Sequence, residues 1–209
     1  MKKPLLWSFH VGAAVIGLSL LPAGATEPGP YVKADGGANF ITGTELKING
    51  FPGGLSLDTG FRADGIFGYQ FNSWLAVEFE GGFMQNSVNS VSLQGVTSYP
   101  QEHSYFQQVP LLANVVVRYE NSTDFIPYLG AGAGGVISRL KIAGNSDDEA
   151  AFAFQAKAGL IYKIEETAWL DIGYKLLGTT EQTFGIGGDQ LKTKDMLNHF
   201  IGASVTWLF

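Results

Sequence analysis

The chain of 209 residues contains no cysteine. This excludes a disulfide framework, a thiolate metal site and a cysteine nucleophile. Basic residues are also scarce, because 13 Lys and Arg stand against 19 Asp and Glu, for a net charge of −6. An acidic chain without basic clusters is a poor candidate for binding nucleic acid. We therefore expect no nucleic-acid partner, and no motif predicts a cofactor or a metal.

Long apolar runs are missing from most of the chain. A helix that crosses a bilayer needs about 20 apolar residues, and no such segment follows residue 25. Near the start, two lysines precede an apolar run over 11–21, and small residues follow at 23–25. A transmembrane helix is the alternative there, but the run is too short for one. The order is typical of a cleavable secretory signal. We predict a signal peptide over 1–25 and one mature domain over 26–209.

The rest of the chain alternates between apolar and small or polar residues. In the last stretch the apolar positions are Ile201, Ala203, Val205, Trp207 and Phe209. A period of two indicates a strand with one apolar face. Seven earlier segments follow the same pattern. The predicted strands are therefore about 31–41, 57–71, 74–84, 105–120, 126–140, 151–164, 168–177 and 198–209.

The connections between these segments alternate in length. Short turns are expected near residues 72, 122 and 166. Longer loops, rich in Gly, Ser, Asn and Thr, are expected over 42–56, 85–103, 144–147 and 179–194. Short turns at one rim, with long loops at the other, are typical of an outer-membrane barrel.

The direction of the apolar face separates two kinds of barrel. A soluble, lipocalin-like barrel would turn this face inward onto a ligand. Here the polar face is rich in glycine, only 15% of residues are charged, and aromatic residues stand near strand ends. A crowded eight-stranded interior and interfacial aromatic girdles explain these features better. We predict an all-β fold, an eight-stranded antiparallel up-and-down transmembrane β-barrel, preceded by the signal peptide and located in the outer membrane.

Charged residues on the inward face balance one another, five basic against five acidic. The ten predicted interior charges are Lys33, Asp35, Arg62, Asp64, Glu78, Glu80, Arg118, Lys157, Asp171 and Lys175. Because a charge removed from water must pair or stay hydrated, we expect a charge-paired plug, with water-filled pockets as the alternative. We expect Arg118 to pair with a buried acid. An open pore is not expected, since side chains fill an eight-stranded barrel.

Several stretches carry a resemblance to a known family. They are 31–37 (YVKADGG), 109–114 (VPLLAN), 127–134 (PYLGAGAG) and the terminal Trp207-Leu208-Phe209. With these, residues 31–209 resemble the small outer-membrane β-barrel family, which includes the barrel domain of outer membrane protein A and the opacity-type surface proteins. The resemblance implies insertion by the barrel-assembly machinery, with Trp207 and Phe209 as the assembly signal. The sequence departs from outer membrane protein A at its end, since it stops with the last predicted strand, and we therefore expect it to lack the peptidoglycan-binding domain of that protein.

Catalytic motifs are weak. The glycine string over 130–135 fits a dinucleotide fingerprint, but the sequence continues as a strand where a helix is required. His103 and His199 lie on distant strands, so a shared metal is not expected. Outer-membrane lipid A deacylases carry a His-x-Ser pair, whereas Ile201 stands at that spacing from His199. We therefore expect no enzyme, and we interpret His199 as an interfacial aromatic residue.

Three functions remain open from the sequence. The favoured one is a non-enzymatic barrel for envelope structure and surface interaction through the long loops. The alternatives are a narrow porin-like channel or lateral route for small molecules, and a lipid-modifying enzyme. The expected partners are outer-membrane lipid and lipopolysaccharide, the assembly machinery during insertion, and a host or surface ligand at the loops.

Overall fold

The computed structural model describes residues 28–42, 45–93, 96–98, 104–119, 121–194 and 196–209. The predicted signal peptide and His103 lie outside the described residues. Within the described part, no helix is long and apolar enough to cross a bilayer.

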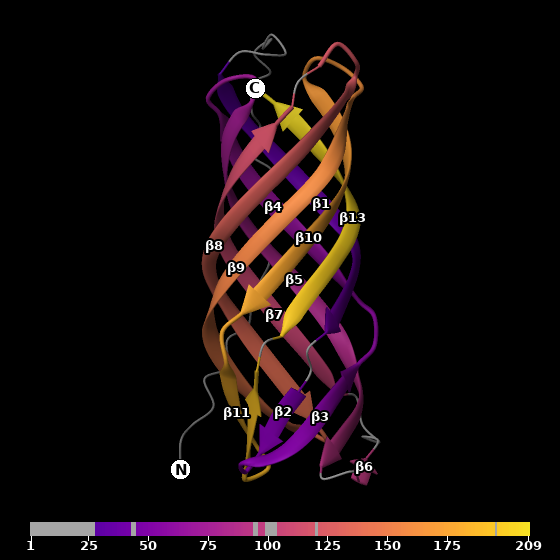
Figure 1. Ribbon diagram of the computed structural model, residues 1–209, viewed down its shortest axis with the longest axis vertical. Helices are drawn as coiled ribbons and strands as arrows, with labels where there is room; N and C mark the ends of the chain where they lie inside the picture. Colours follow the sequence, from indigo (N-terminus) through magenta and orange to yellow (C-terminus); the bar gives the residue numbers. More distant parts are fainter. Residues whose placement is uncertain (1–27, 43–44, 94–95, 99–103, 120, 195) are drawn as a thin grey trace.

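Eight long strands form a closed antiparallel barrel (Figure 1). They are β1 (Gly29–Thr42), β4 (Gly60–Gln70), β5 (Leu75–Leu93), β7 (Tyr105–Arg118), β8 (Phe125–Ile142), β9 (Asn145–Lys163), β10 (Ala168–Thr179) and β13 (Leu197–Leu208). Each strand pairs with its neighbour in the chain order of these eight, and β1 pairs with β13 to close the ring. The predicted eight-stranded up-and-down barrel is therefore confirmed.

The predicted long loops are wrong over much of their length, because they contain further β-structure. β5 continues to Leu93, and β8 and β9 run together to a tight turn at Ala143-Gly144. The additional strands are β2 (Glu45–Ile48), β3 (Phe51–Leu57), β6 (Val96–Ser98), β11 (Gln182–Ile186) and β12 (Asp189–Thr193). Four of them pair in the order β11-β12-β2-β3 and join β5, with which β6 also pairs, and together they extend the barrel at one end (Figure 1). We call this end the hairpin end and the opposite end the short-turn end.

Positive backbone φ angles explain how the chain reverses so sharply at the hairpin end. Both central residues of three turns have them: Asn49 (50°) with Gly50 (87°), Ala143 (47°) with Gly144 (84°), and Gly187 (62°) with Gly188 (98°). Two successive positive values are the geometry of the type I′ turn, whose twist matches that of the paired strands. The turns therefore keep the flanking residues in register as hairpins.

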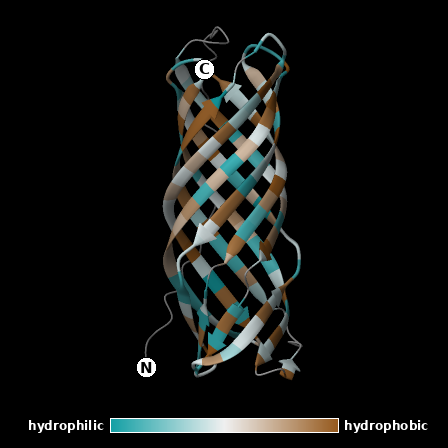
Figure 2. Cartoon of the chain, viewed as in Figure 1, coloured by the Kyte–Doolittle hydropathy of each residue, from teal (hydrophilic) through white to brown (hydrophobic). Residues whose placement is uncertain are grey.

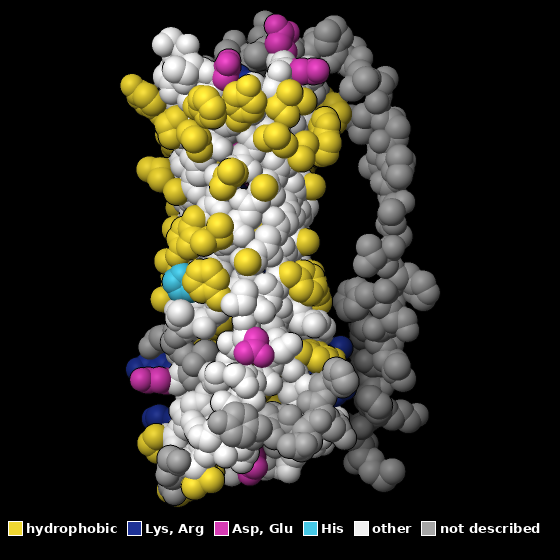
Figure 3. Space-filling model, turned by 90° about the vertical axis from the view of Figure 1, so that its right-hand side faces the viewer, with side chains coloured by type: hydrophobic (Ala, Val, Ile, Leu, Met, Phe, Trp, Pro, Cys, Tyr) yellow, Lys and Arg dark blue, Asp and Glu magenta, His cyan; other side chains and the backbone are white. Residues whose placement is uncertain are grey.

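The two faces of the wall differ in polarity. Along β7 the outward residues Val109, Leu111, Val115 and Val117 are 38–62% exposed, while their neighbours are buried. Apolar and polar residues alternate along the barrel strands (Figure 2). In the space-filling view, hydrophobic side chains crowd the short-turn end and continue down the wall to the histidine (Figure 3). A band of exposed apolar side chains is what a lipid-facing wall requires.

Ion pairs cover part of the surface at the hairpin end. Arg139 contacts Asp148 at 2.6 Å, and Lys192 contacts Glu181 at 2.7 Å, with all four side chains about half exposed. The hydrogen bonds from Arg139 hold the pKa of the Asp148 carboxyl below its usual value. This part of the wall is therefore suited to water, in contrast to the apolar band.

Candidate functional site: the charged interior

The barrel interior contains all ten predicted charges. Each is at most 9% exposed, and these ten are the buried charged side chains of the described residues. They come from six strands: β1, β4, β5, β7, β9 and β10. Because the strands alternate strictly between the two faces, an inward side chain every second residue brings the set together along the axis.

Lys175 is the centre of the first group of charges. Its Nζ lies 2.6 Å from Asp35 Oδ2, 2.7 Å from Asp64 Oδ2 and 2.7 Å from Glu80 Oε1. The three carboxylates come from β1, β4 and β5, whereas Lys175 lies on β10. Since β5 and β10 are four strands apart in either direction, the contact with Glu80 spans the barrel.

Arg62 completes this group from β4. Its Nε lies 2.7 Å from Asp64 Oδ2 and its Nη2 lies 2.8 Å from Glu80 Oε1. Nη2 also donates to Gln155 Oε1 on β9, at 3.0 Å. The amides of Gln155 and Asn114 both donate to Glu80 Oε2, at 3.0 Å. Carboxylates held by two cations and by amide donors can remain charged without water.

A second group lies nearer the short-turn end. Lys33 Nζ contacts Asp171 Oδ2 at 2.5 Å, and Lys157 pairs with Glu78. Tyr31 donates its hydroxyl to Glu78 Oε1 at 2.7 Å. Lys157 also lies 3.5 Å from Glu80, which links the two groups into one network.

Hydroxyl groups satisfy the remaining carboxylate of the second group. Tyr128 donates to Asp171 Oδ1 at 3.2 Å, and Ser204 donates to the other oxygen. The ring of Tyr128 also lies under Lys33 Nζ, 5.1 Å from its centroid. The aromatic residues therefore serve the charges as hydrogen-bond donors and as cation partners.

Arg118 differs from the sequence expectation, because no described acid lies within ion-pair distance of it. Its Nη1 donates to Gln70 Oε1 at 2.5 Å. The guanidinium lies 5.0 Å from the ring centroid of Tyr31 and 5.1 Å from that of Trp169. The inward neighbours of Arg118 include Tyr31, Trp169 and Gln70, so the cation contacts rings and an amide where an acid was expected.

Glycines make room for the network on the same inward face. A Cβ added to Gly82 would stand 1.7 Å from Asp64 Oδ1, and one added to Gly132 would stand 2.1 Å from Asn114 Oδ1. Real atoms cannot approach so closely. The glycine-rich polar face thus accommodates side chains that reach across from neighbouring strands.

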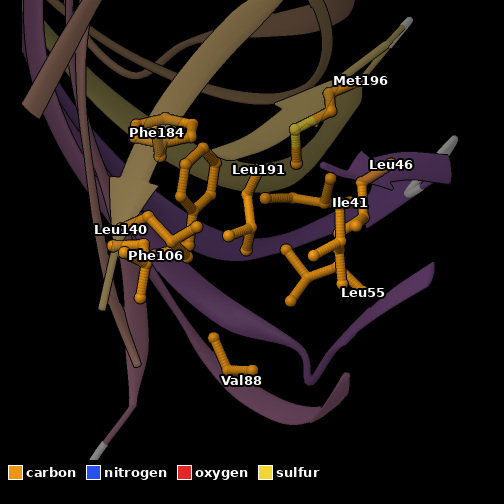
Figure 4. Packing of buried hydrophobic residues seen from close by; sticks show 11 residues of the cluster. Ile41, Leu46, Leu55, Val88, Phe106, Leu140, Phe184, Leu191 and Met196 are labelled. Atoms are coloured by element: carbon orange, nitrogen blue, oxygen red, sulfur yellow. The ribbon is translucent and has the colours of Figure 1, made fainter. Parts of the chain in front are cut away.

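Apolar clusters lie on both sides of the charges along the barrel axis. The short-turn cluster consists of Tyr31, Ala76, Val116, Ile126, Tyr128, Ile161, Trp169 and Leu208. The hairpin-end cluster is larger (Figure 4) and consists of Ile41, Leu46, Ile48, Leu55, Val88, Phe106, Leu140, Phe184, Ile186, Leu191 and Met196. Within it, Phe106 and Phe184 meet edge to face, with centroids 6.1 Å apart. A small void of about 10 Å³ beside Lys33, Glu78 and Arg118 has room for about one water molecule.

The predicted assembly residues lie at the end of β13. Trp207 points outward and is 46% exposed, among the aromatic residues of the short-turn rim. Phe209 donates its backbone N–H to Pro30 O at 3.1 Å, which continues the pairing of β13 with β1 by one residue. Their role in assembly stays a prediction.

On the outer wall, three strands bring together a polar cluster that the sequence did not reveal. His199 Nε2 lies 2.8 Å from Thr42 Oγ1 on β1, and Nδ1 lies 2.7 Å from the Tyr174 hydroxyl on β10. The imidazole stacks on Phe40, with centroids 5.1 Å apart and planes inclined by 2°. The strand of His199 has Ile201 where a His-x-Ser pair requires a hydroxyl, whereas the fold supplies two hydroxyls from adjacent strands. Pairing of the predicted first strand with the last strand would have placed the Thr42 hydroxyl beside His199.

A model of the outer membrane protein β-barrel domain matches residues 11–209. The chain belongs to this family. Membership places it in the Gram-negative outer membrane. A curated outer membrane protein of Gluconacetobacter diazotrophicus is 25% identical over 181 residues, which cover 72% of this chain and 46% of the relative. The chain thus spans about half the length of that relative.

Solved structures show the same fold at low identity. The outer membrane protein OprG of Pseudomonas aeruginosa has a TM-score of 0.60 and 16% identity, with 88% of this chain and 99% of OprG covered. Neisserial surface protein A has a TM-score of 0.56 and 15% identity, with 86% and 97% covered. These similarities support the barrel architecture.

Proposed function

We propose that this family member is a non-enzymatic envelope barrel whose interior is closed to solutes and whose hairpin end is a contact surface outside the cell. The observation that carries the proposal is the contact of Lys175 on β10 with Glu80 on β5, across the whole barrel. Because the cation also holds two further carboxylates, displacing it would expose several charges without partners. The ion-paired interior charges therefore support closure as their role.

The orientation follows the general arrangement of outer-membrane barrels. Their short turns are periplasmic and their longer connections face outward. The short-turn end of this protein would then lie in the periplasm, and the hairpin end outside. Regular hairpins with half-exposed ion pairs form a more rigid surface than irregular loops, which suits contact with a host or surface ligand.

Liposome swelling with solutes of graded size tests the closure. We expect vesicles that contain the folded protein to swell no faster than empty vesicles in small sugars or amino acids. Swelling that depends on protein and on solute size would reject the closed barrel.

Shortened hairpins test the contact surface. A variant in which residues 46–54 are replaced by a two-residue turn removes most of β2 and β3 and leaves the eight barrel strands. We expect it to keep its heat-modifiable mobility and to lose adhesion of expressing cells to the surface that wild-type cells bind. Equal adhesion by both would contradict a role for this hairpin.

A route for small hydrophobic molecules is the second candidate. It is favoured by a hollow of about 350 Å³ beside β3 and β5, where Ile41, Leu55 and Leu57 meet Ser90 and Ser92. Two of these apolar residues, Ile41 and Leu55, also belong to the hairpin-end cluster. If the hollow is an entrance, a Ser90→Trp variant should slow the uptake of a small hydrophobic dye. Equal dye uptake by empty vesicles and by vesicles with wild-type or variant protein would reject this route and would favour the closed barrel.

A further inference from the structure

We propose that Thr42, Tyr174 and His199 form a lipid site on the outer wall, which donates a hydrogen bond to an acyl-ester carbonyl of an outer-leaflet lipid. The cluster is separate from the charged interior, because all three side chains point outward from adjacent strands. The inference rests on the proposed orientation, since it places the cluster in the outer leaflet.

The depth of the cluster follows from β13. From Trp207 to His199 the strand advances about 27 Å at ~3.4 Å per residue, or about 20 Å along the membrane normal at a tilt of about 40°. The apolar band of such barrels is about 25 Å tall. With Trp207 at one rim, His199 lies just inside the other. In the space-filling view the histidine lies beside apolar side chains of the wall, well away from the short-turn rim (Figure 3).

The neighbours of His199 fix the boundary more closely. Its cross-strand partners are Phe40 on β1 and Leu176 on β10, and one step further along β1 the outward residue is Thr42. The Thr42 hydroxyl thus lies on the headgroup side of the imidazole, beside the outward Leu197, with which Thr42 pairs. Acyl-ester carbonyls occupy this boundary, whereas phosphates lie further out.

Counting hydrogens shows that the cluster needs an external acceptor. Neutral imidazole carries one N–H, and the two hydroxyls carry one O–H each. The two hydrogen bonds to His199 use two of these three hydrogens, whichever tautomer is present. No other described residue is recorded as a side-chain partner of Thr42 or Tyr174. One O–H therefore remains for a lipid, and protonation of His199 would leave two.

An unpaired donor is costly at this depth. At the edge of the hydrocarbon little water is present to accept the hydrogen, so an unsatisfied group is unfavourable. A carbonyl oxygen on a lipid tail accepts it with no other change in the protein. The flat Phe40 and His199 stack beside the hydroxyls offers a surface for the acyl chain of the same lipid.

Native mass spectrometry of the detergent-solubilised protein tests the site with two phosphatidylcholines of equal chain length. One has ester-linked chains and the other ether-linked chains, which lack the carbonyl. We expect wild-type protein to retain the ester lipid about fivefold more strongly than the ether lipid. This is the ratio of affinities that one hydrogen bond provides. The double variant T42V/Y174F should lose this preference, and Y162F, which removes an outward hydroxyl at the opposite rim, should keep it.

Three outcomes would overturn the site. They are equal retention of ester and ether lipids by wild type, an ester preference that survives in the double variant, and a bound lipid that has lost an acyl chain. Loss of an acyl chain would mean that the hydroxyl and the imidazole cleave the lipid ester and do not simply bind it. None of them affects the closed interior, which the swelling assay tests independently.

Discussion

Lys175 and Glu80 meet at 2.7 Å although their strands, β10 and β5, stand on opposite sides of the barrel. A contact of this kind joins the two halves of the wall through the interior. It stabilises the closed barrel only while both charges are present, because a single buried charge is far less stable than a pair.

The first prediction concerns this lysine. Lys175→Met removes the cation shared by Asp35, Asp64 and Glu80, so we expect the free energy of unfolding to fall by about 3–5 kcal/mol. Urea titration in lipid vesicles, followed by heat-modifiable mobility, measures the change. Lys192→Met is the matched control, since its ion pair is about half exposed and is worth at most ~1 kcal/mol. Equal urea midpoints for the two variants would contradict the central role of Lys175.

Arg118 should be less important than its burial suggests. Arg118→Met removes one hydrogen bond to Gln70 and two ring contacts, and it leaves no carboxylate without its cation. We expect a loss of about 1–3 kcal/mol, smaller than that of Lys175→Met. The same urea titration compares the two. A larger loss for Arg118 would mean that it neutralises an acid in solution.

Gly82 tests the room that the network needs. Gly82→Ala puts a methyl group on Asp64 Oδ1 and should push this carboxylate away from Arg62, at a cost of about 1–3 kcal/mol. Gly65→Ala is the control, because a Cβ there meets no atom within 4 Å. If both variants unfold at the wild-type urea concentration, the interior is looser than the structure shows.

Ala143 should limit the stability of the β8–β9 hairpin. Its φ of 47° is unfavourable for alanine, and Ala143→Asn gives the preferred Asn-Gly pair of a type I′ turn. We expect a gain of roughly 0.5–1 kcal/mol, and a loss for Gly144→Ala at φ 84°. Hydrogen exchange of the β8 and β9 amides near the turn reports both effects. Faster exchange in Ala143→Asn would show that the turn is not strained.

The period of two predicted the barrel and the inward positions because alternation is a local property of each strand. It did not predict the hairpin end, although Asn49-Gly50 is a strong hairpin signal, since β2 and β3 are short and contain Pro52 and two glycines. Local sequence patterns do not indicate which side chains of distant strands come into contact. The sequence predicted an acidic partner for Arg118, but the partner is Gln70. The hydroxyl of Thr42 lies beside His199 because β1 pairs with β13, which the sequence pattern of neither strand indicates alone.

Single-channel recording in planar bilayers tests the closed interior most directly. With folded wild-type protein, we predict a current indistinguishable from that of the bare bilayer at all applied voltages below its breakdown. Stable conductance steps that scale with salt concentration would contradict the closure, because ions could then pass Lys175 and its three carboxylates.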